Sequence, residues 1–144
     1  MPLQKTHCYT NASGQDVWHF ILSNTTGTRA GISNYGALIT SFVVSDKNGM
    51  ENDIVLGFDQ VEDYSSPAYL ATYPYFGCVV GRTANRIKNA KFELEGKEYH
   101  VTANFGKHQL HGGKEGFDKK IWEITGSGEF PAPWVEMKYL SPDG

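Results

Sequence analysis

The chain has 144 residues, 40% of them hydrophobic, so it is long enough to bury one ordinary core and too apolar for a disordered segment. Its 16 acidic and 13 basic residues give a net charge of −3 without any basic cluster, which argues against nucleic-acid binding. No apolar run approaches the ~18 residues that a membrane-spanning helix needs. The N-terminus lacks the apolar core of a signal peptide, so a cytoplasmic protein is expected.

The first part of the chain has the pattern of β-strands. Residues 17–22 (VWHFIL) are rich in aromatic and β-branched side chains and lie between turn formers, and residues 37–44 form a second predicted strand. The Asn-Gly pair at 48–49 predicts a hairpin turn into a strand over residues 52–57. Residues 61–64 have the length of one helical turn, but no 11-residue window shows sustained helical periodicity. An all-β chain is therefore expected.

The segment from Asp63 to Pro74 differs from its neighbours. Proline restrains the backbone and interrupts regular elements, so this segment is predicted to be an ordered loop. Loop tyrosines most often pack on their own domain, and stacking against a bound ring is the alternative interpretation. Four tyrosines lie around the breaks: Tyr64, Tyr69, Tyr73 and Tyr75.

A second hairpin is predicted with its turn at residues 95–96. This register pairs Phe92 with Tyr99, which gives one apolar face of the kind that a sandwich strand requires. On the other face it sets Glu93 opposite Glu98, a mild like-charge cost that solvent screens.

The last part of the chain predicts two more strands. Residues 126–133 (GSGEFPAP) have the glycine and proline content of a loop, between strands that end near Ile124 and begin near Trp134. The final strand, residues 134–140, alternates well enough for an edge position.

The two cysteines, Cys8 and Cys78, do not form a CxxC pair, so a zinc or redox motif is not indicated. Cys78 is interpreted as a small buried hydrophobic residue, and a disulfide between the two is left open.

The most informative polar residues lie in two turn-like segments, GRTANRI at 81–87 and LHGG at 110–113. They place an amide, a guanidinium and an imidazole (Asn85, Arg86 and His111) on either side of the second hairpin, which is expected to fix the distance between Arg86 and His111. Arginine and asparagine donate to ring and hydroxyl oxygens, and histidine donates or accepts near neutral pH. The cluster therefore suits a neutral, hydroxyl-rich ligand.

The neighbours of this cluster have structural interpretations. Gly112 and Gly113 are expected to allow a close backbone approach or a positive φ angle. Arg82 is interpreted as an ion-pair partner, and Asp118 is expected to pair with Arg82 or Lys119. Two histidines of this region are expected at the surface: His100 and His108.

These segments also carry a family resemblance. GRTANRI, the strand pair FELEGKEYHV and the segment LHGGKEGFDKKIW, in this order and spacing, resemble the aldose 1-epimerases, also called galactose mutarotases. Three further segments fall in the expected order: ISNYGALI (an early strand of the family), DIVLGFD and YFG. The resemblance extends from about Trp18 to Trp122. It implies an all-β antiparallel β-sandwich of the galactose mutarotase supersandwich type, with residues 1–144 as the N-terminal part of a single domain truncated at its C-terminus.

The resemblance also implies a function, the interconversion of α and β anomers of galactose, glucose or a similar aldose without a cofactor. By the same resemblance, Asn85 and Arg86 hydrogen-bond the sugar near its ring oxygen and hydroxyls, and His111 contacts and polarises the anomeric region. The family's proton donor, a second histidine, and its proton acceptor, a glutamate, are expected beyond Gly144. No catalytic residue is therefore assigned in this chain, and little or no turnover is expected. No metal is expected either, because the five histidines lack ligand spacing with carboxylates.

Three alternatives stay open. One is a non-catalytic carbohydrate-binding or interaction module on the same scaffold. Another is a fragment without a stable fold, because half a sandwich leaves strand edges and an apolar face uncovered. The third is a complementary C-terminal chain that supplies the rest of the site.

Overall fold

The computed structural model describes residues 2–143, which form two compact units. Among the described residues, the first unit comprises 2–78 and 121–143, and the second comprises Val79–Lys120. Among residues 2–143, no helix is long and apolar enough to cross a bilayer.

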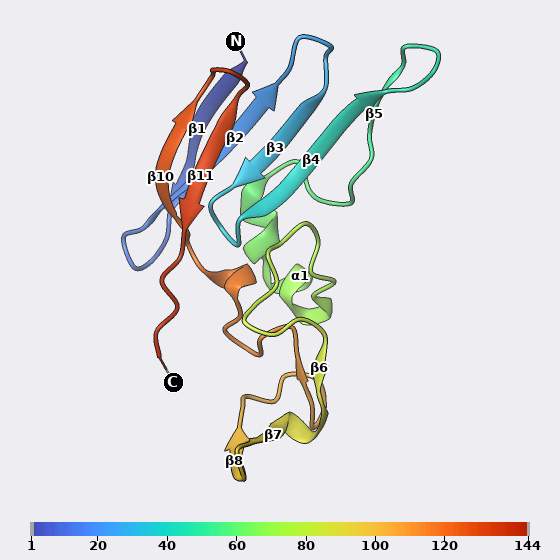
Figure 1. Cartoon of the computed structure of the whole chain (residues 1–144). Helices are drawn as coiled ribbons and strands as arrows, with labels where there is room; N and C mark the ends of the chain where they lie inside the picture. Colours follow the sequence, from blue (N-terminus) through green and yellow to red (C-terminus); the bar gives the residue numbers. More distant parts are fainter. Residues whose placement is uncertain (1, 144) are drawn as a thin grey trace. The chain divides into compact units, whose positions relative to one another are not determined.

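The first unit is built around a five-stranded antiparallel sheet in the order β1-β2-β3-β4-β5, together with the hairpin β10-β11 (Figure 1). Its elements are β1 (Leu3–Thr10), β2 (Asp16–Ser23), β3 (Arg29–Ser33), β4 (Leu38–Ser45), β5 (Glu51–Asp53), the 3₁₀ helix η1 (Val61–Ser65), α1 (Pro67–Thr72), β10 (Glu123–Gly128) and β11 (Trp134–Lys138). These antiparallel sheets confirm the all-β prediction.

Two of these strands lie where the pattern of aromatic and β-branched residues predicts them. β2 extends the predicted range by one residue at each end, and β4 has the predicted length but begins and ends one residue later. The ISNYGALI segment is different, because it contains the end of β3, a turn and the start of β4 instead of one strand. Gly36 and Ala37 adopt positive φ angles of 63° and 46° in that turn, so the chain reverses there.

β5 is shorter than the predicted strand over residues 52–57. The carboxylate of Asp53 accepts hydrogen bonds from the backbone N–H of Phe42 at 2.9 Å and of Val55 at 3.1 Å. The Asp53 side chain thus binds backbone N–H groups that would otherwise pair in a longer ladder, and the strand ends at this residue.

The predicted loop over residues 63–74 contains a short helix, α1, so this part of the prediction is wrong. The Ser66 hydroxyl accepts a hydrogen bond from the backbone N–H of Tyr69 at 3.3 Å and caps the helix. Pro67 occupies the first helical turn, where its fixed φ angle favours the helix and its missing N–H costs nothing. The proline that suggests a break is therefore a helix start.

Aromatic residues from this segment form much of the core. Tyr64 and Tyr69 are only 1% and 6% exposed, and Phe58 contacts both rings edge to face. Their hydroxyl oxygens accept the backbone N–H groups of Phe58 (3.0 Å) and Phe76 (2.9 Å), so each buried phenol has a polar partner. Burial also raises the pKa of Tyr64. Packing on their own unit is thus confirmed for these two tyrosines. Cys78 packs half-buried on the same core.

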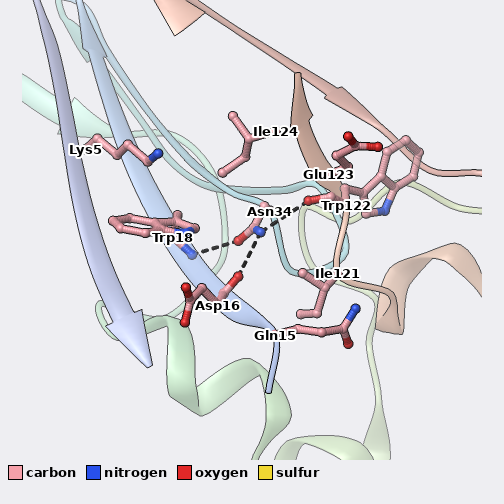
Figure 2. A pocket seen from close by; sticks show the side chains of 9 residues that line it. All are labelled: Lys5, Gln15, Asp16, Trp18, Asn34, Ile121, Trp122, Glu123 and Ile124. Carbon is pink, nitrogen blue, oxygen red and sulfur yellow. Dashed lines mark hydrogen bonds between the residues drawn. The ribbon is translucent and has the colours of Figure 1, made fainter. Parts of the chain in front are cut away.

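Asn34 connects the five-stranded sheet with β10. Its side-chain oxygen accepts the backbone N–H of Trp18 at 2.7 Å, and its amide donates to the carbonyls of Asp16 at 3.1 Å and Trp122 at 3.2 Å (Figure 2). Asn34 is 3% exposed and lines an open pocket of about 380 Å³ together with Trp18, Trp122 and Ile124 (Figure 2). Its amide therefore satisfies three backbone groups at once.

The second unit consists of short elements. They are β6 (Arg86–Ile87), the 3₁₀ helix η2 (Lys88–Ala90), β7 (Lys91–Leu94), β8 (Lys97–His100), β9 (Gln109–Leu110) and the 3₁₀ helix η3 (Phe117–Lys119). β6 pairs with β9 and β7 pairs with β8, both antiparallel.

We predict that Asn34→Ala lowers the free energy of unfolding by about 2–3 kcal/mol, because it removes a buried side chain that bonds three backbone groups. Urea unfolding followed by tryptophan fluorescence measures this loss. The matched control is Asn24→Ala: Asn24 accepts the N–H groups of Thr26 and Thr28 in an exposed turn, where water replaces it. Equal losses in the two variants would contradict the role of Asn34.

We also predict that stability falls on acidification because of His19. This half-buried side chain lies on β2 with Nε2 2.8 Å from the Thr40 hydroxyl, and burial lowers its pKa below the ordinary 6.5. The unfolded chain therefore takes up a proton near pH 6.5 while the folded chain resists it, so the free energy of unfolding decreases as pH falls through 6.5. His19→Gln keeps a polar group near Thr40 without titrating. Its urea midpoint should fall less between pH 7 and pH 5, and equal slopes would refute the assignment.

Candidate functional site

The three residues predicted to bind a ligand lie together in the second unit, around the ladder of β6 and β9. In this ladder Arg86 pairs with Leu110 and Ile87 with Gln109. Asn85 and His111 therefore lie opposite one another at the same end of the ladder, although 26 positions separate them in the chain.

Asn85 and His111 exchange two hydrogen bonds. The backbone N–H of His111 donates to the Asn85 carbonyl at 3.0 Å, and the backbone N–H of Asn85 donates to Nδ1 of the His111 ring at 3.0 Å. Because Nδ1 accepts, the proton of the neutral imidazole lies on Nε2. The ring therefore offers a hydrogen-bond donor on its side away from Asn85.

Arg86 lies beside this pair. Its Nη1 donates to the side-chain oxygen of Asn85 at 3.1 Å, and its guanidinium carbon lies 4.9 Å from the centre of the Phe105 ring. Asn85 and Arg86 are exposed and His111 is half-buried, so solutes can reach the cluster. The contact with Asn85 uses one of the five N–H donors of a guanidinium, and the fork is suited to pairs of oxygens.

The glycines after His111 are required by the backbone. Gly112 and Gly113 have φ angles of 90° and 87°, as the prediction of positive φ expected. A Cβ on Gly112 would lie 1.8 Å from the carbonyl oxygen of Gly81, so the close neighbour is the GRTANRI segment itself. The two motifs that stand out in the sequence are thus in backbone contact.

The hairpin β7-β8 has the predicted register, with Phe92 opposite Tyr99 and Glu93 opposite Glu98. Lys91 lies 2.6 Å from Glu98 and lowers the pKa of that carboxyl, which relieves the like-charge pairing. The face of this hairpin is nevertheless exposed, with Phe92 and Tyr99 stacked at 5.3 Å, rather than buried as a sandwich strand would be.

The sequence predicts that the hairpin fixes the distance between Arg86 and His111, but the segments that carry these residues are connected directly. The β6-β9 ladder and the Asn85–His111 bonds join the two segments without it. Elsewhere in the unit, Asp118 is fully buried and pairs with Lys119, one of its two predicted partners.

Sequence reasoning missed three residues that support the cluster. The Asn104 amide donates to the Leu110 carbonyl at 2.9 Å and accepts the Leu110 N–H at 2.7 Å, which holds the strand that pairs with Arg86. Phe105 lies under Arg86, and His108, expected simply at the surface, is half-buried and accepts the Asn89 N–H at 3.0 Å. The sequence ANFGKH carries no periodic or spacing signal that indicates these contacts.

No metal site accompanies the cluster in the part of the chain that the structure describes. Within residues 2–143, no group of three or more histidine, cysteine, aspartate or glutamate side chains is placed to hold a metal ion. The chemistry that the cluster offers is hydrogen bonding from nitrogen donors.

Sequence and structure comparisons identify relatives of the chain. Residues 19–144 match the sequence model of the family described as Aldose 1-epimerase. The chain is 45% identical over 118 residues to galactose mutarotase from Bos taurus, which covers 81% of this chain and 31% of that protein. It is 44% identical over 108 residues to aldose 1-epimerase from Haemophilus influenzae, covering 75% and 29%.

Two crystal structures resemble the chain. An aldose epimerase homologue from C. elegans aligns with a TM-score of 0.66 at 37% identity, over 75% of this chain and 32% of that chain. Galactose 1-epimerase from Lactobacillus acidophilus aligns with a TM-score of 0.81 at 24% identity, over 99% and 39%, and shows the shared fold. The chain spans about a third of the length of the relatives that it matches. The match over residues 19–144 shows that this chain belongs to the aldose 1-epimerase family.

Proposed function

We propose that this chain carries the sugar-holding part of an aldose 1-epimerase, which interconverts the α and β anomers of galactose, glucose or a similar aldose without a cofactor. The observation that supports this proposal is the hydrogen-bonded cluster of Asn85, Arg86 and His111. An aldose presents a ring oxygen and several hydroxyls, and the cluster presents several nitrogen donors in a fixed arrangement.

Each side chain has a distinct part in the proposal. The Arg86 fork binds two oxygens of the sugar, and the Asn85 amide nitrogen donates to a third, because its oxygen is occupied by Arg86. The Nε2–H of His111 points at the anomeric region and stabilises negative charge on oxygen as the ring opens. Holding the hydroxyls keeps the open chain in place until the ring closes again.

Anomer exchange also needs a base for the C1 hydroxyl proton and an acid for the ring oxygen. Family resemblance assigns these roles to a glutamate and a second histidine outside residues 1–144, which we propose form the N-terminal part of one domain. Each proton transfer contributes roughly 10²–10⁴-fold, so the chain alone should turn over sugar near the background rate.

A non-catalytic sugar-binding module is the second candidate function. The observation that favours it is that the cluster and its supporting residues all lie within Val79–Lys120. Binding could therefore persist in a protein that lacks the proton-transferring residues. A separate C-terminal chain that restores exchange when added would instead support a divided enzyme.

Proton NMR of the 144-residue chain with galactose tests the proposal. We predict dispersed amide signals, galactose binding, and saturation transfer between the anomeric protons at the buffer rate. Arg86→Ala should weaken binding about 10-fold or more, because hydrogen bonds to a charged donor are lost. The matched control is Arg29→Ala, whose guanidinium pairs with Glu51 in the first unit and should leave binding unchanged.

Each result bears on a different part of the proposal. Exchange above the buffer rate would mean that the chain supplies its own acid and base. Undiminished binding in Arg86→Ala would remove Arg86 from the site, and collapsed amide signals would support the alternative of a fragment that does not fold.

A second prediction separates two roles of His111. Asparagine places its side-chain oxygen near the position of Nδ1 and tolerates the His111 φ angle of 50°, so His111→Asn keeps the bond from Asn85 and removes the Nε2 donor. We expect galactose affinity to fall about 5-fold with a change in melting temperature of about 2 °C or less.

The matched control is His108→Asn, because His108 accepts a backbone N–H through Nδ1 at the same distance of 3.0 Å. It should change neither affinity nor melting temperature. A large drop in the melting temperature of His111→Asn with unchanged affinity would make His111 a purely structural residue.

A further inference from the structure

We infer that Phe105 is a positioning residue that holds the Arg86 guanidinium in the orientation in which it meets a sugar. This inference rests on the function proposed above and adds a residue that neither the motifs nor the comparisons indicate. The central observation is the guanidinium carbon of Arg86 4.9 Å from the centre of the Phe105 ring, while Nη1 of the same guanidinium donates to Asn85.

An exposed arginine is a poor binding group unless something restricts it. Its long side chain has high rotamer entropy, which a ligand must otherwise overcome on binding. Arg86 is restricted at three levels: its backbone pairs with Leu110, its Nη1 donates to Asn85, and its guanidinium lies over Phe105. Of these three, the contact with Phe105 holds the guanidinium group without using one of its N–H donors.

The geometry of a cation–π contact explains why this matters. The ring attracts the cation through its face, whereas the N–H donors of a guanidinium lie in its own plane. A guanidinium resting on a ring therefore keeps its fork directed outward to oxygens beside it. Phe105 orients Arg86 without competing with the sugar.

The backbone of Phe105 is itself held by His108, the residue before β9. Its N–H and carbonyl form hydrogen bonds of 3.1 and 3.0 Å with the backbone of His108, which closes a tight turn. Its neighbour Asn104 binds both backbone groups of Leu110 at 2.7 and 2.9 Å. The backbone that carries the Phe105 ring is thus tied to the strand opposite Arg86.

Core packing does not account for this phenylalanine. Its side chain is 50% exposed, so its burial contributes less to stability than that of a core residue such as Phe20, which is fully buried. Its replacement should therefore affect Arg86 more than the fold.

The test uses the full 144-residue chain and two readouts. Phe105→Leu keeps an apolar side chain but removes the ring, and Phe105→Trp restores a better cation–π partner. We expect Phe105→Leu to weaken galactose binding about 2- to 5-fold, Phe105→Trp to match or exceed the original affinity, and both to melt within about 2 °C of the original. In NMR spectra, the Arg86 Cδ protons should be shifted upfield by the ring and lose that shift in Phe105→Leu.

Phe92→Leu is the matched control, because Phe92 is a 42% exposed aromatic residue of the same unit that stacks on Tyr99. It should leave galactose affinity and the Arg86 signals unchanged.

The outcomes distinguish this inference from the function on which it rests. If Arg86→Ala weakens binding and Phe105→Leu does not, the positioning role is wrong and the proposed site stands. Nuclear Overhauser effects between galactose and the Phe105 ring would mean that the ring contacts sugar itself, which also overturns the inference. An unsubstituted chain that binds no galactose would overturn the proposed function and this inference with it.

Discussion

The second unit depends on the pair of hydrogen bonds that Asn85 and His111 exchange. β6 and β9 have only two residues each, and so short a ladder is marginal by itself. The imidazole of His111 adds a side-chain acceptor at one end of the ladder, and His108 does the same for Asn89 near the other end, both at 3.0 Å. Two histidines therefore extend the ladder beyond its backbone pairs, and in the one at the Asn85 end the bond to Nδ1 leaves the proton of the neutral ring on Nε2.

Positive φ angles explain why these positions carry asparagine and glycine. Asn85, Asn89 and His111 have φ angles of 63°, 55° and 50°, and Gly112 has 90°. Asparagine and glycine adopt this region at low cost, which lets each backbone N–H turn toward a histidine ring or a neighbouring carbonyl. The same residues thus shape the turns and present the donors. Alanine substitutions here change both properties, whereas asparagine in place of histidine changes one.

Features set by local pattern could be predicted from the sequence. The positions of β2 and β4 and the register of β7-β8 follow from strand periodicity and turn residues. The early end of β5, the start of α1 and the support from Asn104 could not be predicted, because each depends on a side chain that binds a particular backbone group. The prediction of the site residues depended on the family resemblance, because a single arginine or histidine in a turn usually has a structural role. The structure brings those residues together, and their roles in binding are still predictions.

The geometry of the cluster also constrains what it can contribute to the proposed reaction. Nδ1 of His111 accepts the Asn85 N–H, so its neutral ring can offer only a donor from Nε2. The Asn85 oxygen accepts from Arg86, and a guanidinium has no acceptor. The three side chains are therefore committed to donating, which suits the ring oxygen, the hydroxyls and the developing charge on an aldose. Accepting the proton of the C1 hydroxyl is a different chemical requirement. A proton acceptor placed among these donors would accept their hydrogen bonds in place of the sugar. An epimerase built on this cluster must therefore bring its base from another part of the fold.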